Sequence, residues 1–184
     1  MQKYLIPKIS FKDLLLILKF SLLGAAIAAC YGIVHDQITY SISPEYYTKL
    51  KFSQFAYADF GLGDRFFAAI IGFLASWWFG FFSAWFYCRI LLNRGIENNL
   101  LSKHLRAFLF IFAYAFLAAL CGFLMGQFHS GNYKDWMPVC RQLKINDIPS
   151  FVQVAYIHNG SYAGSFFGLI LQIAFIFKKR TLDD

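Results

Sequence analysis

Four long apolar stretches take up about half of this chain of 184 residues. They run from Leu14 to Val34, from Phe66 to Leu92, from Leu105 to Phe128 and roughly from Gly160 to Phe177. The hydrocarbon core of a bilayer is about 30 Å thick, so a helix needs about 20 apolar residues to cross it. A soluble domain of this length does not contain four such runs. The sequence therefore predicts an all-α fold, an integral membrane protein in which four helices form a bundle.

The predicted membrane spans cover residues 13–34, 66–92, 105–128 and 150–178, within a single domain over residues 1–184. The first apolar run is too long for the core of a cleavable signal peptide, and no small-x-small site follows it, so we expect it to stay as an anchor. Two extracytoplasmic loops of about 30 residues and one short polar connection, Arg94–His104, join the spans. The short connection predicts that spans two and three are antiparallel neighbours, with His104 on the solvated surface.

The basic residues are distributed unevenly, and this predicts the orientation of the chain. The net charge is +7, and eleven of the 17 Lys and Arg side chains lie in the two termini, the early first span and the short middle connection. Because basic residues collect on the cytoplasmic side of membrane proteins, both termini are predicted to be cytoplasmic, with residues 35–65 and 129–158 outside. The same rule accounts for the positive charge without nucleic acid, and membrane lipid is the partner that we expect.

Small residues recur at every fourth position of each span and so line one face of each helix. They are Gly24, Ala28 and Gly32 in the first span, Gly72, Ser76 and Gly80 in the second, Gly122 and Gly126 in the third, and Gly160, Gly164 and Gly168 in the fourth. Lipid tails are as apolar as Leu, so membrane helices associate by close packing, which small residues permit. Whether these ladders pack helices within one chain or between chains stays open. We expect a homo-oligomer or a subunit of a membrane complex.

Polar side chains gather at one end of the spans under this topology. They are His35, Asp36, Gln37 and Glu45 after the first span, His129 after the third, and His158, Asn159 and Tyr162 at the start of the fourth. Ionisable groups at membrane depth are costly and usually mark function. Two or three histidines with a carboxylate can bind zinc or another transition metal, and His35, Asp36 and His158 are the candidate ligands.

The same residues permit other interpretations. They could act as the acid and the base of a hydrolase-type site, or as a proton-sensitive switch. They could also lie at the water boundary, where they would hydrogen-bond to helix ends and loop backbone. Their spacing matches no metal motif, so the sequence leaves the cofactor open.

A weak repeat links the two halves of the chain. The pattern Gly-x-x-His-x8-Pro begins at Gly32 and again at Gly126, in each case at the end of an odd-numbered span. Parallel repeats occur in membrane folds. Little else aligns between the halves, so duplication and coincidence both stay open.

Three blocks of sequence resemble a family of uncharacterised bacterial four-helix integral membrane proteins. Residues 35–48 read HDQITYSISPEYYT, which is similar to the family pattern HDQ-x-[ST]…SPEYFT except that Tyr47 replaces the usual Phe. Residues 72–80 read GFLASWWFG and residues 158–164 read HNGSYAG, which resemble the blocks G-x-x-A-[ST]-W-W-x-G and HN-x-SY-x-G. The resemblance covers spans one, two and four. It implies a location in the bacterial cytoplasmic (inner) membrane and a common role for the three blocks, and it implies no reaction.

Three classes of function fit this sequence. The leading hypothesis is a non-enzymatic membrane protein, a sensor, scaffold or assembly subunit with a polar site on its outer face. The alternative is an integral membrane enzyme, with or without a metal, that acts on a lipid or lipid-linked substrate at the outer leaflet through His35, Asp36, Glu45, His129 and His158. A small transporter or channel is the third class, and it is disfavoured because the spans hold almost no charge beyond Lys19.

Overall fold

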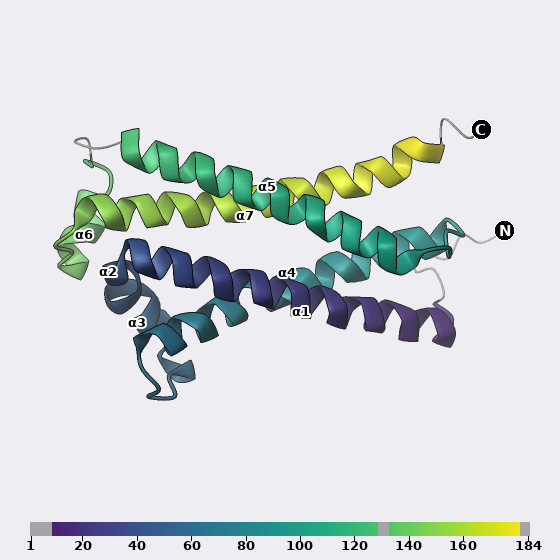
Figure 1. The fold of residues 1–184 in the computed structure, drawn as a ribbon, viewed down its shortest axis with the longest axis horizontal. Coiled ribbons are helices and arrows are strands. Elements are labelled where there is room, and N and C mark those ends of the chain that lie inside the picture. Colours follow the sequence, from purple (N-terminus) through teal and green to yellow (C-terminus); the bar gives the residue numbers. More distant parts are fainter. Residues whose placement is uncertain (1–8, 129–132, 181–184) are drawn as a thin grey trace.

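Four long helices make up most of the protein in its computed structural model, which describes residues 9–128 and 133–180 (Figure 1). They are α1 (Phe11–Ile42), α4 (Asp64–Asn93), α5 (Leu100–Phe128) and α7 (Ile148–Arg180). Each is long and apolar enough to cross a membrane, and the described residues include no strand. The predicted all-α fold is therefore confirmed, and the chain has the four membrane-length helices of a multi-pass membrane protein.

The helices extend beyond the apolar runs. α1 continues to Ile42, past the predicted end of its span at Val34, and its 32 residues span about 48 Å. A bilayer core is only about 30 Å thick, so a helix of this length projects from it and its last turns need not be apolar. α1 ends where Ser43 adopts an extended conformation, because the residue before Pro44 avoids the helical region. The first long connection, residues 43–63, is therefore shorter than predicted, and the second ends before Ile148, earlier than predicted.

The four helices pack as two hairpins. α1 lies along α4 and α5 lies along α7, whereas α4 and α5 touch at only a few positions (Figure 1). The prediction that spans two and three are neighbours is therefore wrong. A short connection holds two helix ends together, but it does not decide which helix faces pack along their length. We call α1 with α4 the first hairpin and α5 with α7 the second hairpin.

Glycines lie where the helices of each hairpin approach most closely. A Cβ atom added to Gly32 would overlap the carbonyl oxygen of Gly72, and one added to Gly72 would overlap that of Gly32. In the second hairpin, a Cβ atom added to Gly160 would overlap the carbonyl oxygen of Ala118. Backbones approach this closely only where side chains are small. Further contacts of this kind involve Gly24, Ala28, Ser76, Gly80, Gly122, Gly126, Gly164 and Gly168.

The two long connections form a cap at one end of the bundle, which we call the loop end. The first connection contains α2 (Pro44–Tyr46), the π-helical turn η1 (Tyr47–Lys51), α3 (Phe52–Gln54) and the 3₁₀ turn η2 (Ala56–Ala58), and the second contains α6 (Met137–Leu143). Both prolines of the weak repeat, Pro44 and Pro138, lie in the first turn of a short helix. The cap packs through the buried side chains of Tyr46, Tyr47 and Cys140 against the start of α7.

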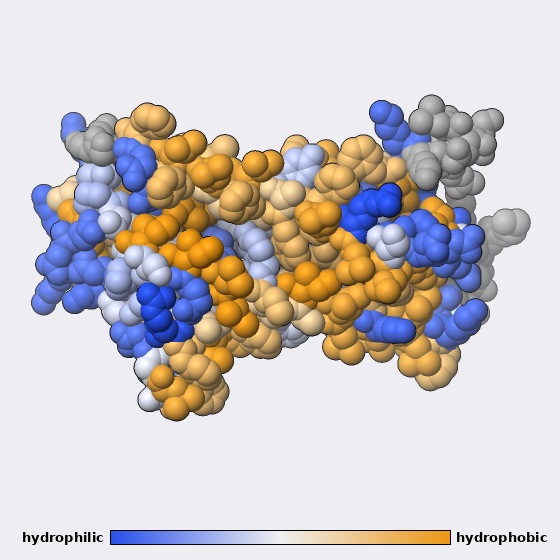
Figure 2. Space-filling view, in the orientation of Figure 1, coloured by the Kyte–Doolittle hydropathy of each residue, from blue (hydrophilic) through white to orange (hydrophobic). Residues whose placement is uncertain are grey.

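The two ends of the bundle are polar and its middle is apolar. Figure 2 shows hydrophobic residues across the middle of the visible face and hydrophilic residues gathered at both ends. The start of α1 and the end of α7 lie opposite the cap, at the same end as the α4–α5 connection (Figure 1). A bilayer requires an apolar band between two polar ends. This distribution agrees with a multi-pass membrane protein, and which end faces the cytoplasm stays a prediction.

His104 is buried, which contradicts its predicted place on the solvated surface. α5 begins at Leu100, so His104 lies one turn inside a helix and is only 1% exposed. Its ring stacks on that of Phe20 in α1, with the ring centroids 4.0 Å apart. Its Nδ1 lies 2.8 Å from the carbonyl oxygen of Leu100. The polar connection Arg94–His104 is therefore only partly solvated, because its last residues, from Leu100 on, already belong to α5.

Candidate polar site between the two hairpins

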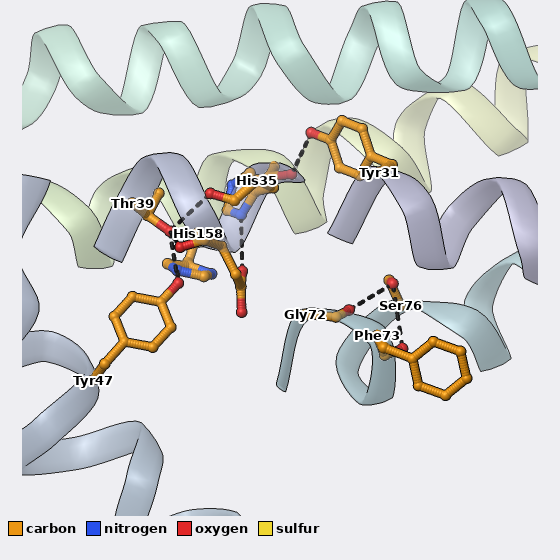
Figure 3. A network of polar contacts seen from close by, with 10 residues as sticks. Tyr31, His35, Thr39, Tyr47, Gly72, Phe73, Ser76 and His158 are labelled. Atoms are coloured by element: carbon orange, nitrogen blue, oxygen red, sulfur yellow. Dashed lines mark hydrogen bonds and ion pairs between the residues drawn. The ribbon is translucent and has the colours of Figure 1, made fainter. Parts of the chain in front are cut away.

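Three of the predicted site residues meet near the loop end of the bundle. His35 and Asp36 come from α1 and His158 comes from α7, so the site joins the two hairpins (Figure 3). One potential ligand atom from each residue lies within 4.8 Å of the other two. Asp36 and His158 are buried, with 4% and 2% of their surface exposed. Within residues 9–128 and 133–180, no other group of three His, Cys, Asp or Glu side chains comes this close together.

The close approach of α1 and α4 explains why Asp36 is buried. Asp36 follows Gly32 by four residues, which places it on the face of α1 that touches α4. A buried carboxylate is costly unless it is paired or hydrogen-bonded. Nδ1 of His35 lies 3.1 Å from Asp36 Oδ1, and the side chain of Tyr47 also interacts with the carboxylate of Asp36. Because an ionised carboxylate can only accept, His35 donates its Nδ1–H to Asp36.

A chain of hydrogen bonds links Thr39, Tyr47 and His158. The Thr39 hydroxyl lies 3.0 Å from the carbonyl oxygen of His35 and 2.6 Å from the hydroxyl of Tyr47. The hydroxyl of Tyr47 lies 3.4 Å from Nε2 of His158 (Figure 3). In the neutral tautomer of His158 that donates Nε2–H to Tyr47, Nδ1 keeps a lone pair.

Two buried ring nitrogens of the site have no hydrogen-bond partner in the described part of the chain. They are Nε2 of His35 and Nδ1 of His158, and each is a lone-pair nitrogen when the other nitrogen of its ring carries the proton. A buried polar atom left without a partner costs about 1–3 kcal/mol. In these tautomers, the two rings and the carboxylate of Asp36 supply three electron-pair donors, and one ligand atom of each residue lies within 4.8 Å of the other two.

Lys51 is the basic side chain of the cap that interacts electrostatically with this site. Burial lowers the pKa of Lys51, and the carboxylate of Asp36 opposes that effect. Its ammonium group lies 5.9 Å from the ring centroid of Tyr46, which in turn stacks on His158. Among the described residues, no ion pair joins Lys51 to Asp36, so the carboxylate keeps the capacity to bind a cation.

The site opens into a cavity of about 280 Å³ between α1, α4 and α7. Along α1 the cavity extends from Asp36 to Ala28, eight residues or about 12 Å. A hydrogen bond of 2.9 Å between the hydroxyls of Tyr31 and Ser161 crosses from one hairpin to the other beside it. The wall also includes Gly32, Gly72, Ala75, Ser76, Trp78, Phe79, Phe112, Tyr162, Ser165 and Phe166.

The other predicted site residues have different positions. Tyr162 stays beside the site, with its ring centroid 6.0 Å from that of His158. Gln37 turns away and donates to the carbonyl oxygen of Arg65 at 2.8 Å. Asn159 is exposed, and His129 lies outside the described residues.

Glu45 links the two connections of the cap. Its carboxylate accepts the backbone N–H groups of Asp147 and Asn146, at 2.8 and 3.0 Å, and the side-chain amide of Asn146 at 2.8 Å. These bonds, led by the one from Asp147, hold the pKa of Glu45 below its usual value. Glu45 therefore fastens the first connection to the start of α7.

Sequence reasoning missed Thr39 and Tyr47, which orient His158. Thr39 carried a usable signal, because it follows His35 by four residues and so continues the polar face of α1. Tyr47 carried none, because the turn at Ser43 and Pro44 determines where its side chain points.

The fold and the site define a bundle of membrane-length helices with a buried polar site between two hairpins. No family model matches this chain, and no curated protein and no solved structure matches it. Its function is therefore argued from the site itself.

Proposed function

We propose that this protein is an integral membrane enzyme that uses one divalent transition-metal ion, held by His35, Asp36 and His158. The proposal rests on the composition of the site. Two imidazole rings and one carboxylate converge within 4.8 Å, and each ring has a buried nitrogen without a partner among the described residues. Imidazole favours zinc, iron and copper, whereas Mg²⁺ and Ca²⁺ favour sites built from oxygen atoms. We therefore expect Zn²⁺ or Fe²⁺.

Small side-chain movements would bring the three residues to bonding distance. In a tetrahedral site with zinc–ligand bonds of about 2.0–2.1 Å, two ligand atoms lie about 3.4 Å apart. One ligand atom of each residue lies within 4.8 Å of the other two, and Nε2 of His35, which has no partner among the described residues, would bind the ion while Nδ1 keeps its proton on Asp36 Oδ1, 3.1 Å away. The hydroxyl of Tyr47, 3.4 Å from Nε2 of His158, is the kind of outer partner that orients a metal-bound histidine.

A site with three protein ligands favours catalysis over a structural role. Structural zinc sites are closed by four protein ligands, whereas catalytic sites keep one position open for water or substrate. A substrate bound at an open coordination position would occupy the cavity beside His35, Asp36 and His158. A bound ion would polarise a carbonyl or phosphoryl oxygen there, or lower the pKa of a bound water. Under the predicted topology, this chemistry would occur at the outer leaflet on a lipid or lipid-linked group.

The sensor or scaffold hypothesis draws less support from the packing. Its motivation was oligomerisation through the small-residue faces of the helices. In the structure, glycines such as Gly32, Gly72 and Gly160 face neighbouring helices of the same chain. These faces are therefore occupied, and an oligomer would need a different surface.

Metal analysis of the purified protein tests the proposal. The protein, stripped with a chelator and reloaded in mild detergent with Zn²⁺ or, without oxygen, Fe²⁺, should retain one ion per chain. His158→Ala should weaken binding more than about 100-fold, since loss of an outer partner alone costs about 10–100-fold. His104→Ala is the matched control, because it removes a buried histidine from the other end of the bundle.

Thermal unfolding gives a second readout of the same binding. The ligands come from different hairpins, so an ion at 100 times its Kd should stabilise the wild type by about 2.7 kcal/mol. The ion should stabilise His104→Ala equally and His158→Ala hardly at all. Failure of the wild type to hold either ion in stoichiometric amount would contradict the proposal, as would full metal content in His158→Ala.

A further inference from the structure

The cavity beside the polar site is polar at one end and apolar along its length. His35, Asp36 and His158 lie at the end nearest the cap. Aromatic rings from α4, α5 and α7, those of Phe79, Phe112 and Phe166, contribute to the wall further along. This distribution matches an amphiphile, with its head at the histidines and its chain among the rings.

The cavity lies in the part of the bundle that the bilayer surrounds. Its wall uses residues 28–36 of α1 and residues 72–79 of α4, both of which include apolar sequence of the predicted spans. Two of its lining side chains, Trp78 and Phe166, are 48% and 61% exposed, so the cavity reaches the lateral surface of the bundle. A molecule in the bilayer can therefore enter from the side.

We propose that the cavity binds the head-proximal part of one chain of an anionic membrane lipid, with a phosphate or carboxylate oxygen of the lipid on the metal ion. The proposal rests on the metal site proposed above. A divalent ion with two neutral imidazoles and the carboxylate of Asp36 carries one net positive charge, which complements an anionic head. The volume of about 280 Å³ lies just below the range of about 300–1,000 Å³ for small-molecule sites. It accommodates part of one chain, and the remainder of the lipid stays in the bilayer.

Native mass spectrometry of the zinc-loaded protein in mild detergent tests this inference. The probes are phosphatidic acid, which carries an anionic phosphate, and phosphatidylcholine with the same chains. The wild type should bind one phosphatidic acid at least ten times more tightly than phosphatidylcholine. Removal of zinc should abolish this preference, because the charge that attracts the phosphate is then lost. An equal preference in the zinc-free protein would overturn the inference.

Variants that fill the cavity without touching the ligands separate the lipid site from the metal site. Ala75→Phe on α4 and Ser165→Phe on α7 each place a ring in the cavity from opposite walls. Both should lose phosphatidic acid binding while they keep one zinc ion per chain. Ala26→Phe, on the exposed side of α1, is the matched control and should bind as the wild type does.

The outcomes distinguish failure of the two proposals. Normal zinc content with undiminished lipid binding in both cavity variants would overturn the lipid site and leave the metal site standing. Absence of zinc from the wild type would remove the metal site, and with it the charge argument for an anionic lipid. Either cavity variant is informative alone if the other does not fold.

Discussion

The crossing of α1 and α4 gives a prediction whose sign and size both follow from the structure. An added Cβ atom at Gly32 or at Gly72 would overlap the carbonyl oxygen of the other glycine. Overpacking a close contact costs about 1–3 kcal/mol, and alanine recovers about 0.5–1 kcal/mol relative to glycine inside a helix. From the middle of the two ranges, Gly32→Ala and Gly72→Ala should therefore each lower the free energy of unfolding by about 1 kcal/mol.

The double variant shows whether the two substitutions act on one contact. Both added methyl groups need the same increase in the separation of α1 and α4, so the first displacement makes room for the second. The double variant should lower the free energy of unfolding by about 1 kcal/mol less than the sum of the two single effects. Unfolding titrations with SDS in mixed micelles on the wild type and the three variants measure this coupling.

A lipid-facing substitution provides the control for the crossing. Ala26→Leu enlarges an exposed side chain on the same helix and should leave the free energy of unfolding unchanged. Because Gly32 and Gly72 also line the cavity next to Asp36, the destabilised variants should bind metal more weakly. Two neutral single variants, or a double variant that is simply additive, would refute the proposed close contact.

Two further predictions concern the cap and the orientation of the chain. The pKa of Glu45 is held below its ordinary value of 4.5, so its hydrogen bonds stabilise the cap above that pH, and this stabilisation is lost as the pH falls through the lower folded-state pKa. Limited proteolysis should therefore cut the wild-type cap faster at pH 3 than at pH 7. The variant Glu45→Gln should be cut readily at both pH values. The control variant Glu97→Gln, at the other end of the bundle, should be cut at the same rates as the wild type. Reporter fusions at positions 45 and 140 should face outside the cytoplasm, and cytoplasmic signals from both would reverse the topology and move the site to the opposite leaflet.

The membrane spans were predictable because hydrocarbon dictates both the length and the composition of a helix that crosses it. The helix ends were not, because a helix that leaves the hydrocarbon can continue with polar residues, as α1 does from His35 to Ile42. The pairing of helices was not predictable either. All four spans carry small residues at the same spacing, so the pattern fits several pairings equally well.

The candidate site was likewise predictable only in part. The sequence places His35, Asp36 and His158 at one end of the bundle, because span order and the charge bias decide that. Their approach within 4.8 Å depends on how α7 is rotated against the first hairpin, which no local pattern specifies. Glu45 is close to Asp36 in sequence, but the turn after Ser43 redirects the chain and brings Glu45 to Asn146 instead.

The two kinds of helix contact explain where a binding site can form in this bundle. Within each hairpin, glycine contacts such as Gly32 with Gly72 bring the backbones together and leave little space for a ligand. Between the hairpins the helices touch at few positions, and the cavity and the buried polar side chains lie there. A ligand held by His35 and Asp36 on one unit and by His158 on the other would therefore bridge the two hairpins, beside the hydrogen bond between Tyr31 and Ser161 that also joins them.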